Sequence, residues 1–62
     1  MEKYLVWFEN GKSIKVDTIE EVIALEGKNP ITVTCEIYID EDTYIGEYDM
    51  TFEDVKQYFL DE

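Results

Sequence analysis

The chain has no histidine and no arginine, a single cysteine, a single proline and three glycines in 62 residues. Without histidine it lacks the Cys-His and Ser-His pairs that activate nucleophiles, and it lacks the usual zinc ligand sets. The lone Cys35 excludes an internal disulfide and favours a reducing compartment. The scattered glycines form no phosphate-binding loop. We therefore expect a non-enzymatic protein with no catalytic residues, no metal and no cofactor.

Long apolar runs are also missing. The longest run, Tyr4 to Phe8, is far too short to cross a bilayer. No basic stretch is followed by a long apolar segment, so we expect no signal peptide, no membrane contact and a cytoplasmic location. A hydrophobic content of 45% is too high for a disordered chain, and residues 1–62 can hold one small domain.

Positive charge is scarce, with five lysines against sixteen acids and a net charge of −11. Residues 1–35 carry six acids and four lysines, net −2, whereas residues 36–62 carry ten acids and only Lys56, net −9. Such a surface repels nucleic acid and anionic membranes and attracts basic protein surfaces. The alternative interpretation is that the acids serve solubility alone.

The first part of the chain predicts a β-hairpin. Asn10-Gly11 is the preferred pair for a type I′ two-residue turn, in which both residues need positive φ. That turn would pair Trp7 with Ile14. One face of the hairpin would then enter the core with four apolar side chains: Leu5, Trp7, Ile14 and Val16.

The opposite face of this hairpin is apolar as well on its first strand. Tyr4, Val6 and Phe8 lie there in alternation. Because the predicted core leaves this stripe free, it is a candidate homodimer contact or second interface.

Two segments predict helices. Thr18 and Glu21 fit a capping box, and Gly27 is expected to end this helix. Residues 51–62 predict a terminal helix with Thr51 as its cap. TIEEV (18–22) and TFEDV (51–55) share a pattern that either a duplicated unit or two independent caps would explain.

Residues 31–50 alternate between apolar and polar side chains and predict a second hairpin that turns at Glu41-Asp42. The predicted opposed pairs are Asp40 with Thr43, Tyr38 with Ile45, Glu36 with Glu47 and Thr34 with Asp49. The element order is ββαββα, which predicts an α+β domain with a four-stranded antiparallel sheet and two helices packed on one face.

The second hairpin carries the candidate partner-binding site. Like charges directly opposite each other destabilise a sheet, so Glu36 facing Glu47 is an electrostatic cost of a kind that often marks function. Apolar anchor residues contribute most of the binding energy of an interface, and Tyr38 and Ile45 are the candidate anchors on this face. The predicted partner-binding residues are Glu36, Tyr38, Asp40, Glu41, Asp42, Ile45, Glu47 and Asp49.

The size and charge of the chain are of the same order as those of a short stretch of duplex DNA. A 62-residue domain has a diameter of roughly 27 Å by the usual scaling, and duplex DNA of that length carries about 16 phosphate charges. In size, charge and aromatic content the chain resembles the small acidic inhibitors that phages encode against host nucleic-acid enzymes, which include glycosylase inhibitors, anti-restriction proteins and anti-CRISPRs. This resemblance is one of class and rests on no sequence motif. It implies as partner the basic surface of a nucleic-acid-binding or defence protein, and no direct binding of nucleic acid.

Other chemistry fits the sequence less well. A calcium loop starting at Asp40 would need glycine and glutamate where the chain has Ile45 and Thr51. Glu36 and Glu47 could form a glycosidase-like pair only between walls that enclose a substrate. Two other non-enzymatic functions stay open, namely a homodimeric assembly module and an immunity-type protein that neutralises a toxin.

Overall fold

The structure is a computed structural model that describes residues 1–60. Each of two β-hairpins is followed by a helix, with a short 3₁₀ helix before the second hairpin. The elements are β1 (Glu2–Phe8), β2 (Ser13–Val16), α1 (Ile19–Ile23), the 3₁₀ helix (Glu26–Lys28), β3 (Pro30–Asp40), β4 (Thr43–Thr51) and α2 (Phe52–Leu60). The last two residues of the predicted terminal helix lie outside the described residues.

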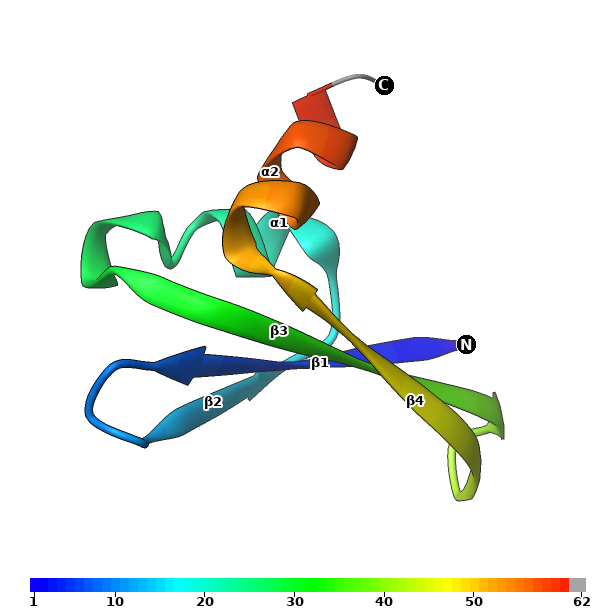
Figure 1. The fold of residues 1–62 in the computed structure, drawn as a ribbon. Coiled ribbons are helices and arrows are strands. Elements are labelled where there is room, and N and C mark those ends of the chain that lie inside the picture. The colour runs from blue at the N-terminus through cyan, green and yellow to red at the C-terminus, as the bar shows by residue number, and fades with distance from the viewer. Residues whose placement is uncertain (61–62) are drawn as a thin grey trace.

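The strands form one antiparallel sheet in the order β2-β1-β3-β4, so the two hairpins meet through β1 and β3. Figure 1 shows both helices on the same side of this sheet, and we call that side the inner face and the opposite side the outer face. The predicted ββαββα order, antiparallel sheet and α+β class are confirmed.

The hydrophobic core lies between the inner face and the helices. Its central side chains, Val6, Val22, Val33 and Val55, have 0–2% of their surface exposed. They come from β1, α1, β3 and α2, so each of these elements contributes a valine to the same cluster. The remaining buried members are Tyr4, Cys35 and Phe52.

Both helices begin at a threonine, as the sequence predicts. The Glu21 amide donates to Thr18 Oγ1 at 3.2 Å, and the Glu21 carboxylate accepts from the Thr18 hydroxyl at 3.0 Å and from the Asp17 amide at 3.4 Å, so Glu21 reaches back over the start of the helix much as in a capping box. The Asp54 amide donates to Thr51 Oγ1 at 3.1 Å. The predicted stop at Gly27 is wrong, because α1 already ends at Ile23 and the left-handed residue that closes the following 3₁₀ turn is Asn29.

The first hairpin differs from its prediction by one residue of register. Val6, not Trp7, lies opposite Ile14. The loop has three residues rather than two: the Gly11 amide donates to the Phe8 carbonyl at 3.0 Å, and Gly11 alone in this loop has positive φ. Because successive side chains alternate between faces, a slip of one residue transfers the opposite set of β1 side chains to the core.

The stripe Tyr4, Val6 and Phe8 is therefore not a free surface. Tyr4 and Val6 are buried in the core, and Phe8 packs against it. The expectation that these three side chains form a homodimer or second interface is wrong for this reason. Trp7, predicted to be in the core, lies on the outer face with 38% of its surface exposed.

The second hairpin follows its predicted register over most of its length. Glu36 lies opposite Glu47, Thr34 opposite Asp49 and Asp40 opposite Thr43. The pairing shifts on both sides of Tyr38, which lies opposite Tyr44 instead of the predicted Ile45. Such an irregularity changes the direction in which nearby side chains point.

Candidate protein-binding site

The two hairpins of the sheet differ in charge. Residues 2–16, which form the first hairpin, carry three lysines and two glutamates, net +1. Residues 30–51, which form the second hairpin, carry six acids and no lysine, net −6. Since β1 and β3 are neighbours, the lysine-bearing half adjoins the acidic half along the middle of the sheet.

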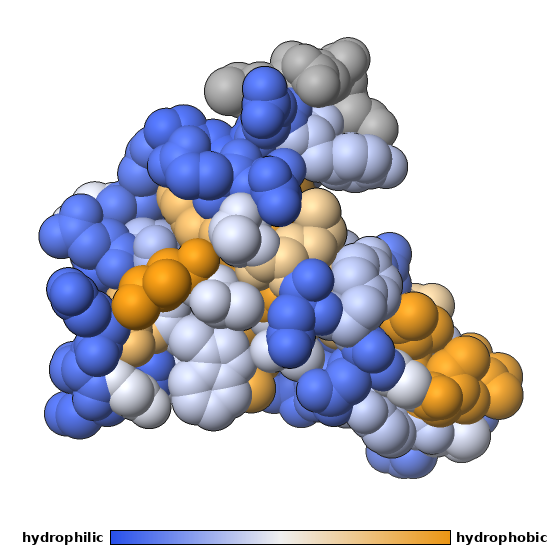
Figure 2. Space-filling model, viewed as in Figure 1, coloured by the Kyte–Doolittle hydropathy of each residue, from blue (hydrophilic) through white to orange (hydrophobic). Residues whose placement is uncertain are grey.

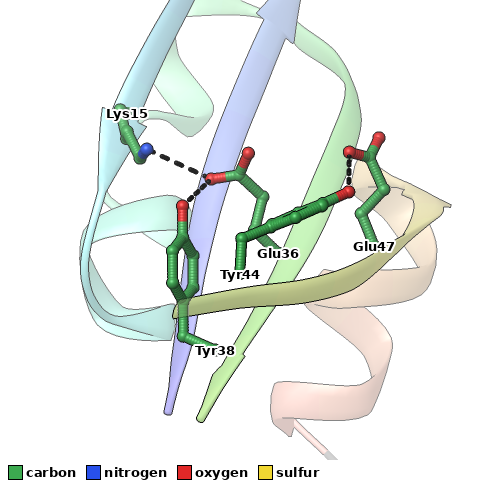
Figure 3. Close-up of polar contacts among 5 residues, drawn as sticks. All are labelled: Lys15, Glu36, Tyr38, Tyr44 and Glu47. Carbon is green, nitrogen blue, oxygen red and sulfur yellow. Dashed lines mark hydrogen bonds and ion pairs between the residues drawn. The ribbon is translucent and has the colours of Figure 1, made fainter. Parts of the chain in front are cut away.

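Glu36 lies at this boundary, and its carboxylate forms an ion pair with a lysine of the first hairpin. Lys15 Nζ is 3.2 Å from Glu36 Oε1, and the Tyr38 hydroxyl donates to the same oxygen at 3.3 Å (Figure 3). The Glu36 side chain is only 18% exposed. The hydrogen bond and charge of Glu36 raise the pKa of Lys15. The repulsion between the opposed Glu36 and Glu47 thus destabilises the sheet less than the sequence suggests, because a lysine from the first hairpin offsets one of the two charges.

Tyr38 contacts two lysines in addition to its hydrogen bond with Glu36. Lys3 Nζ lies 5.2 Å and Lys15 Nζ 5.9 Å from the centre of its ring, within the range of cation–π attraction. Its ring also meets that of Tyr44 edge-on, with centroids 5.8 Å apart and planes at 72°. Tyr38 therefore belongs to a fixed aromatic contact between β3 and β4 and is less free to serve as an anchor than predicted.

Tyr44 connects this contact to Glu47. Its hydroxyl donates to Glu47 Oε1 at 2.6 Å (Figure 3). This hydrogen bond to a carboxylate is the main cause that raises the pKa of Tyr44 to about 12. Glu47 and Tyr44 are both exposed, so this carboxylate remains open to a partner on the outer face.

A second chain of hydrogen bonds connects β1, β3 and β4. The Trp7 indole N–H donates to Thr34 Oγ1 at 3.1 Å, and the Thr34 hydroxyl donates to Asp49 Oδ1 at 2.8 Å. Thr34 is buried with 7% exposure, whereas Asp49 is exposed. The position of the Asp49 carboxylate is thus fixed by two strands beyond its own.

At the tip of the second hairpin the three acids, Asp40, Glu41 and Asp42, are exposed. The Asp42 amide donates to Asp40 Oδ1 at 3.0 Å, and backbone and side-chain hydrogen bonds from Asp42 and Thr43 lower the pKa of Asp40. Apolar surface lies beside them, since Ile39 is 68% and Ile45 57% exposed. Figure 2 shows apolar atoms gathered at this end of the molecule next to hydrophilic ones.

The structure thus divides the eight predicted partner-binding residues into two groups. Glu36 and Tyr38 lie in the middle of the outer face and are occupied by contacts within the chain. The other six are exposed along β4 and at the hairpin tip: Asp40, Glu41, Asp42, Ile45, Glu47 and Asp49.

Lys3, Lys15 and Tyr44 complete the site and were missed in the sequence. Lys3 and Lys15 become neighbours of Glu36 only because β1 lies beside β3, and nothing in the sequence pattern specified that strand order. Tyr44 lies at the irregular pairing of Tyr38, and its hydroxyl reaches Glu47 three residues along, a contact that regular alternation of residues 31–50 does not predict.

Cys35 is buried on the inner face with 2% exposure, as its position between Val33 and Ile37 predicts. Burial raises the pKa of its thiol, so the nucleophilic thiolate is disfavoured. Among residues 1–60, no three cysteine, aspartate or glutamate side chains are grouped so that they could hold a metal ion.

In the part of the chain that the structure describes, no helix has the length and apolar character needed to span a membrane. Comparisons of the chain with protein-family models, with curated proteins and with solved structures find no match.

Proposed function

We propose that this protein is a non-enzymatic acidic binding protein that occupies a basic surface of another protein, where nucleic acid would otherwise bind. The observation that carries the proposal is that the acids along β4 and at the hairpin tip are exposed and, among the described residues, form no ion pair with a lysine. The partner would be a nucleic-acid-binding or defence protein with a groove rich in lysine and arginine. This role suits a phage-encoded inhibitor acting in a bacterial cytoplasm.

The charge arrangement supports this proposal over solubility alone. Of the opposed pair, Glu36 is the less exposed carboxylate, and Lys15 neutralises its charge. Glu47 has no such ion pair and stays exposed to solvent. Charge in an interface chiefly sets the association rate and the register, whereas apolar contact slows dissociation. Ile45 and Ile39 supply such apolar surface directly beside the acids.

A homodimer through Tyr4, Val6 and Phe8 is no longer a competing function, because these side chains pack inside the domain. A net charge of −11 also opposes association of two copies.

The test is affinity capture from a bacterial lysate with two variants of equal charge. Glu41→Lys with Glu47→Lys reverses two exposed acids of the second hairpin, and Glu9→Lys with Glu53→Lys reverses two exposed acids elsewhere. We expect the wild type and the second variant to retain the same nucleic-acid-binding proteins, and duplex DNA to elute them. The first variant should retain them at least tenfold less. Equal capture by both variants, or capture that DNA does not disturb, would exclude the proposed function.

A further inference from the structure

The outer edge of β4 is free to pair with another strand. In the sheet order, β4 is a terminal strand of nine residues, and among residues 1–60 its backbone is paired with β3 alone. A strand at a sheet edge presents a row of unpaired N–H and C=O groups, which is a template for an added strand. The other edge strand, β2, has only four residues and offers a much shorter template.

The side chains on the outer side of this edge are acidic. Glu47 and Asp49 alternate along β4 and are both exposed. A strand paired with β4 would place its own side chains about 5 Å from these carboxylates, where opposite charges stabilise the pairing and like charges oppose it. The edge therefore favours lysine or arginine at alternate positions of an added strand.

The inner side of the same edge is apolar. Tyr48 and Met50 alternate with the two acids and line a cavity of about 330 Å³ between the sheet and α2. The other residues that line the cavity are Glu2, Tyr4, Ile19, Cys35, Val55 and Tyr58, and the Tyr48 hydroxyl donates to Glu2 Oε2 at 3.2 Å. Burial raises the pKa of Tyr48 to about 12, so its phenol is neutral at physiological pH. An added strand would place its second set of side chains on the inner side of the sheet, beside Tyr48 and Met50.

A second copy of this chain fits the edge poorly. Two β4 strands paired with each other would bring Glu47 and Asp49 of one copy against the same acids of the other. Pairing of β4 with β2 of another copy would satisfy only a short part of the edge.

We infer that β4 accepts a strand from a basic partner protein, with lysine or arginine on one face and apolar residues on the other. The basic side chains face Glu47 and Asp49, and the apolar ones lie beside Tyr48 and Met50. This inference rests on the proposed function and specifies how the partner is held, through backbone pairing at the sheet edge rather than by charge alone.

The probe is a seven-residue peptide of alternating lysine and valine, capped at both ends. Its controls are a peptide of the same composition with the lysines grouped before the valines, and two alternating peptides N-methylated either on the lysines or on the valines. Binding is followed by amide NMR and by hydrogen exchange of the residues in β4.

We expect the alternating peptide to bind saturably and to slow exchange at every second amide between Gly46 and Met50. The grouped peptide should bind at least tenfold more weakly. When the peptide runs antiparallel to β4 with its lysines on the outer face, only one of its edges faces the strand. One N-methylated peptide should therefore lose about tenfold in affinity and the other should keep its affinity. No protection along β4, or equal affinity of both N-methylated peptides, would overturn antiparallel strand addition.

A protein variant separates this inference from the proposed function. Glu47→Lys with Asp49→Asn removes both carboxylates of the edge but keeps an acceptor for the Thr34 hydroxyl, and Glu9→Lys with Glu53→Gln changes the net charge by the same amount. We expect only the first variant to weaken binding. If it does so while both N-methylated peptides bind like the unmodified one, the acidic surface stands and strand addition fails. Protection of β4 that grows with protein concentration in the absence of peptide would assign the edge to a second copy and also overturn the inference.

Discussion

The two hairpins share one sheet but contribute differently to it. The first, with net charge +1 in residues 2–16, supplies buried Tyr4 and Val6 to the core and two lysines to the outer face. The second, with net charge −6 in residues 30–51, keeps most of its acids in solvent. The difference shows that the lysines reduce repulsion where the hairpins meet and leave the far edge of the sheet negative.

The largest effect should come from the face of β1 that enters the core. Val6→Asp places an unpaired carboxylate at a site with no exposed surface and should leave the domain unfolded. Leu5→Asp lies on the outer face opposite Lys15 and should leave it folded. Circular dichroism with urea titration measures both. A folded Val6→Asp variant beside an unfolded Leu5→Asp variant would restore the face assignment predicted from the sequence.

The glycine in the loop of the first hairpin and the glycine within β4 of the second should differ in their tolerance of a side chain. Gly11 has a φ of +84°, which costs a residue with a Cβ about 1 kcal/mol. Gly46 has open space where a Cβ would be and no positive φ. Gly11→Ala should therefore lower the free energy of unfolding by about 1 kcal/mol, and Gly46→Ala should not lower it. Equal losses in urea denaturation would contradict the observed three-residue loop.

The sequence predicted the fold better than it predicted the site, and the reasons are physical. Thr18 and Thr51 mark helix starts because their hydroxyls satisfy free amides, and this signal is local. The side chains of residues 4–8 are apolar on both faces, so alternation could not decide which set is buried. The contact of Lys15 with Glu36 joins strands that are distant in sequence, and it depends on a strand order that no local pattern specifies.

A smaller effect on stability should come from the ion pair between Lys15 and Glu36, which joins the two hairpins. Lys15→Ala removes the cation that is ion-paired with Glu36 and leaves only Lys3 nearby, so the opposed Glu36 and Glu47 repel each other more strongly. The melting temperature should fall by a few degrees in low salt, and added salt should recover part of the loss by screening. Lys12→Ala, which follows the loop of the same hairpin, serves as the control. An identical melting temperature for the two variants would show that Lys15 does not stabilise the boundary.

The smallest effect is one of titration. The pKa of Tyr44 is raised to about 12 by its hydrogen bond to Glu47, above the usual 10.0. The stability linked to this bond is therefore fully present below about pH 10 and is lost as the pH rises through about 12. Ultraviolet titration of wild type and Glu47→Gln should show one tyrosine moving toward its usual pKa in the variant. Unchanged titration curves would mean that the hydrogen bond is absent in solution.

The central claim is that the acids of the second hairpin form a binding surface, and the rate of association with a captured partner tests it most directly. Stopped-flow measurements on the wild type and on Glu41→Lys with Glu47→Lys, each at several salt concentrations, separate charge from apolar contact. The wild type should associate fast in low salt and at least tenfold more slowly at high salt. The variant should be slow throughout, with a weaker dependence on salt. Equal rates for the two proteins at every salt concentration would contradict the claim and leave the acids as a device for solubility.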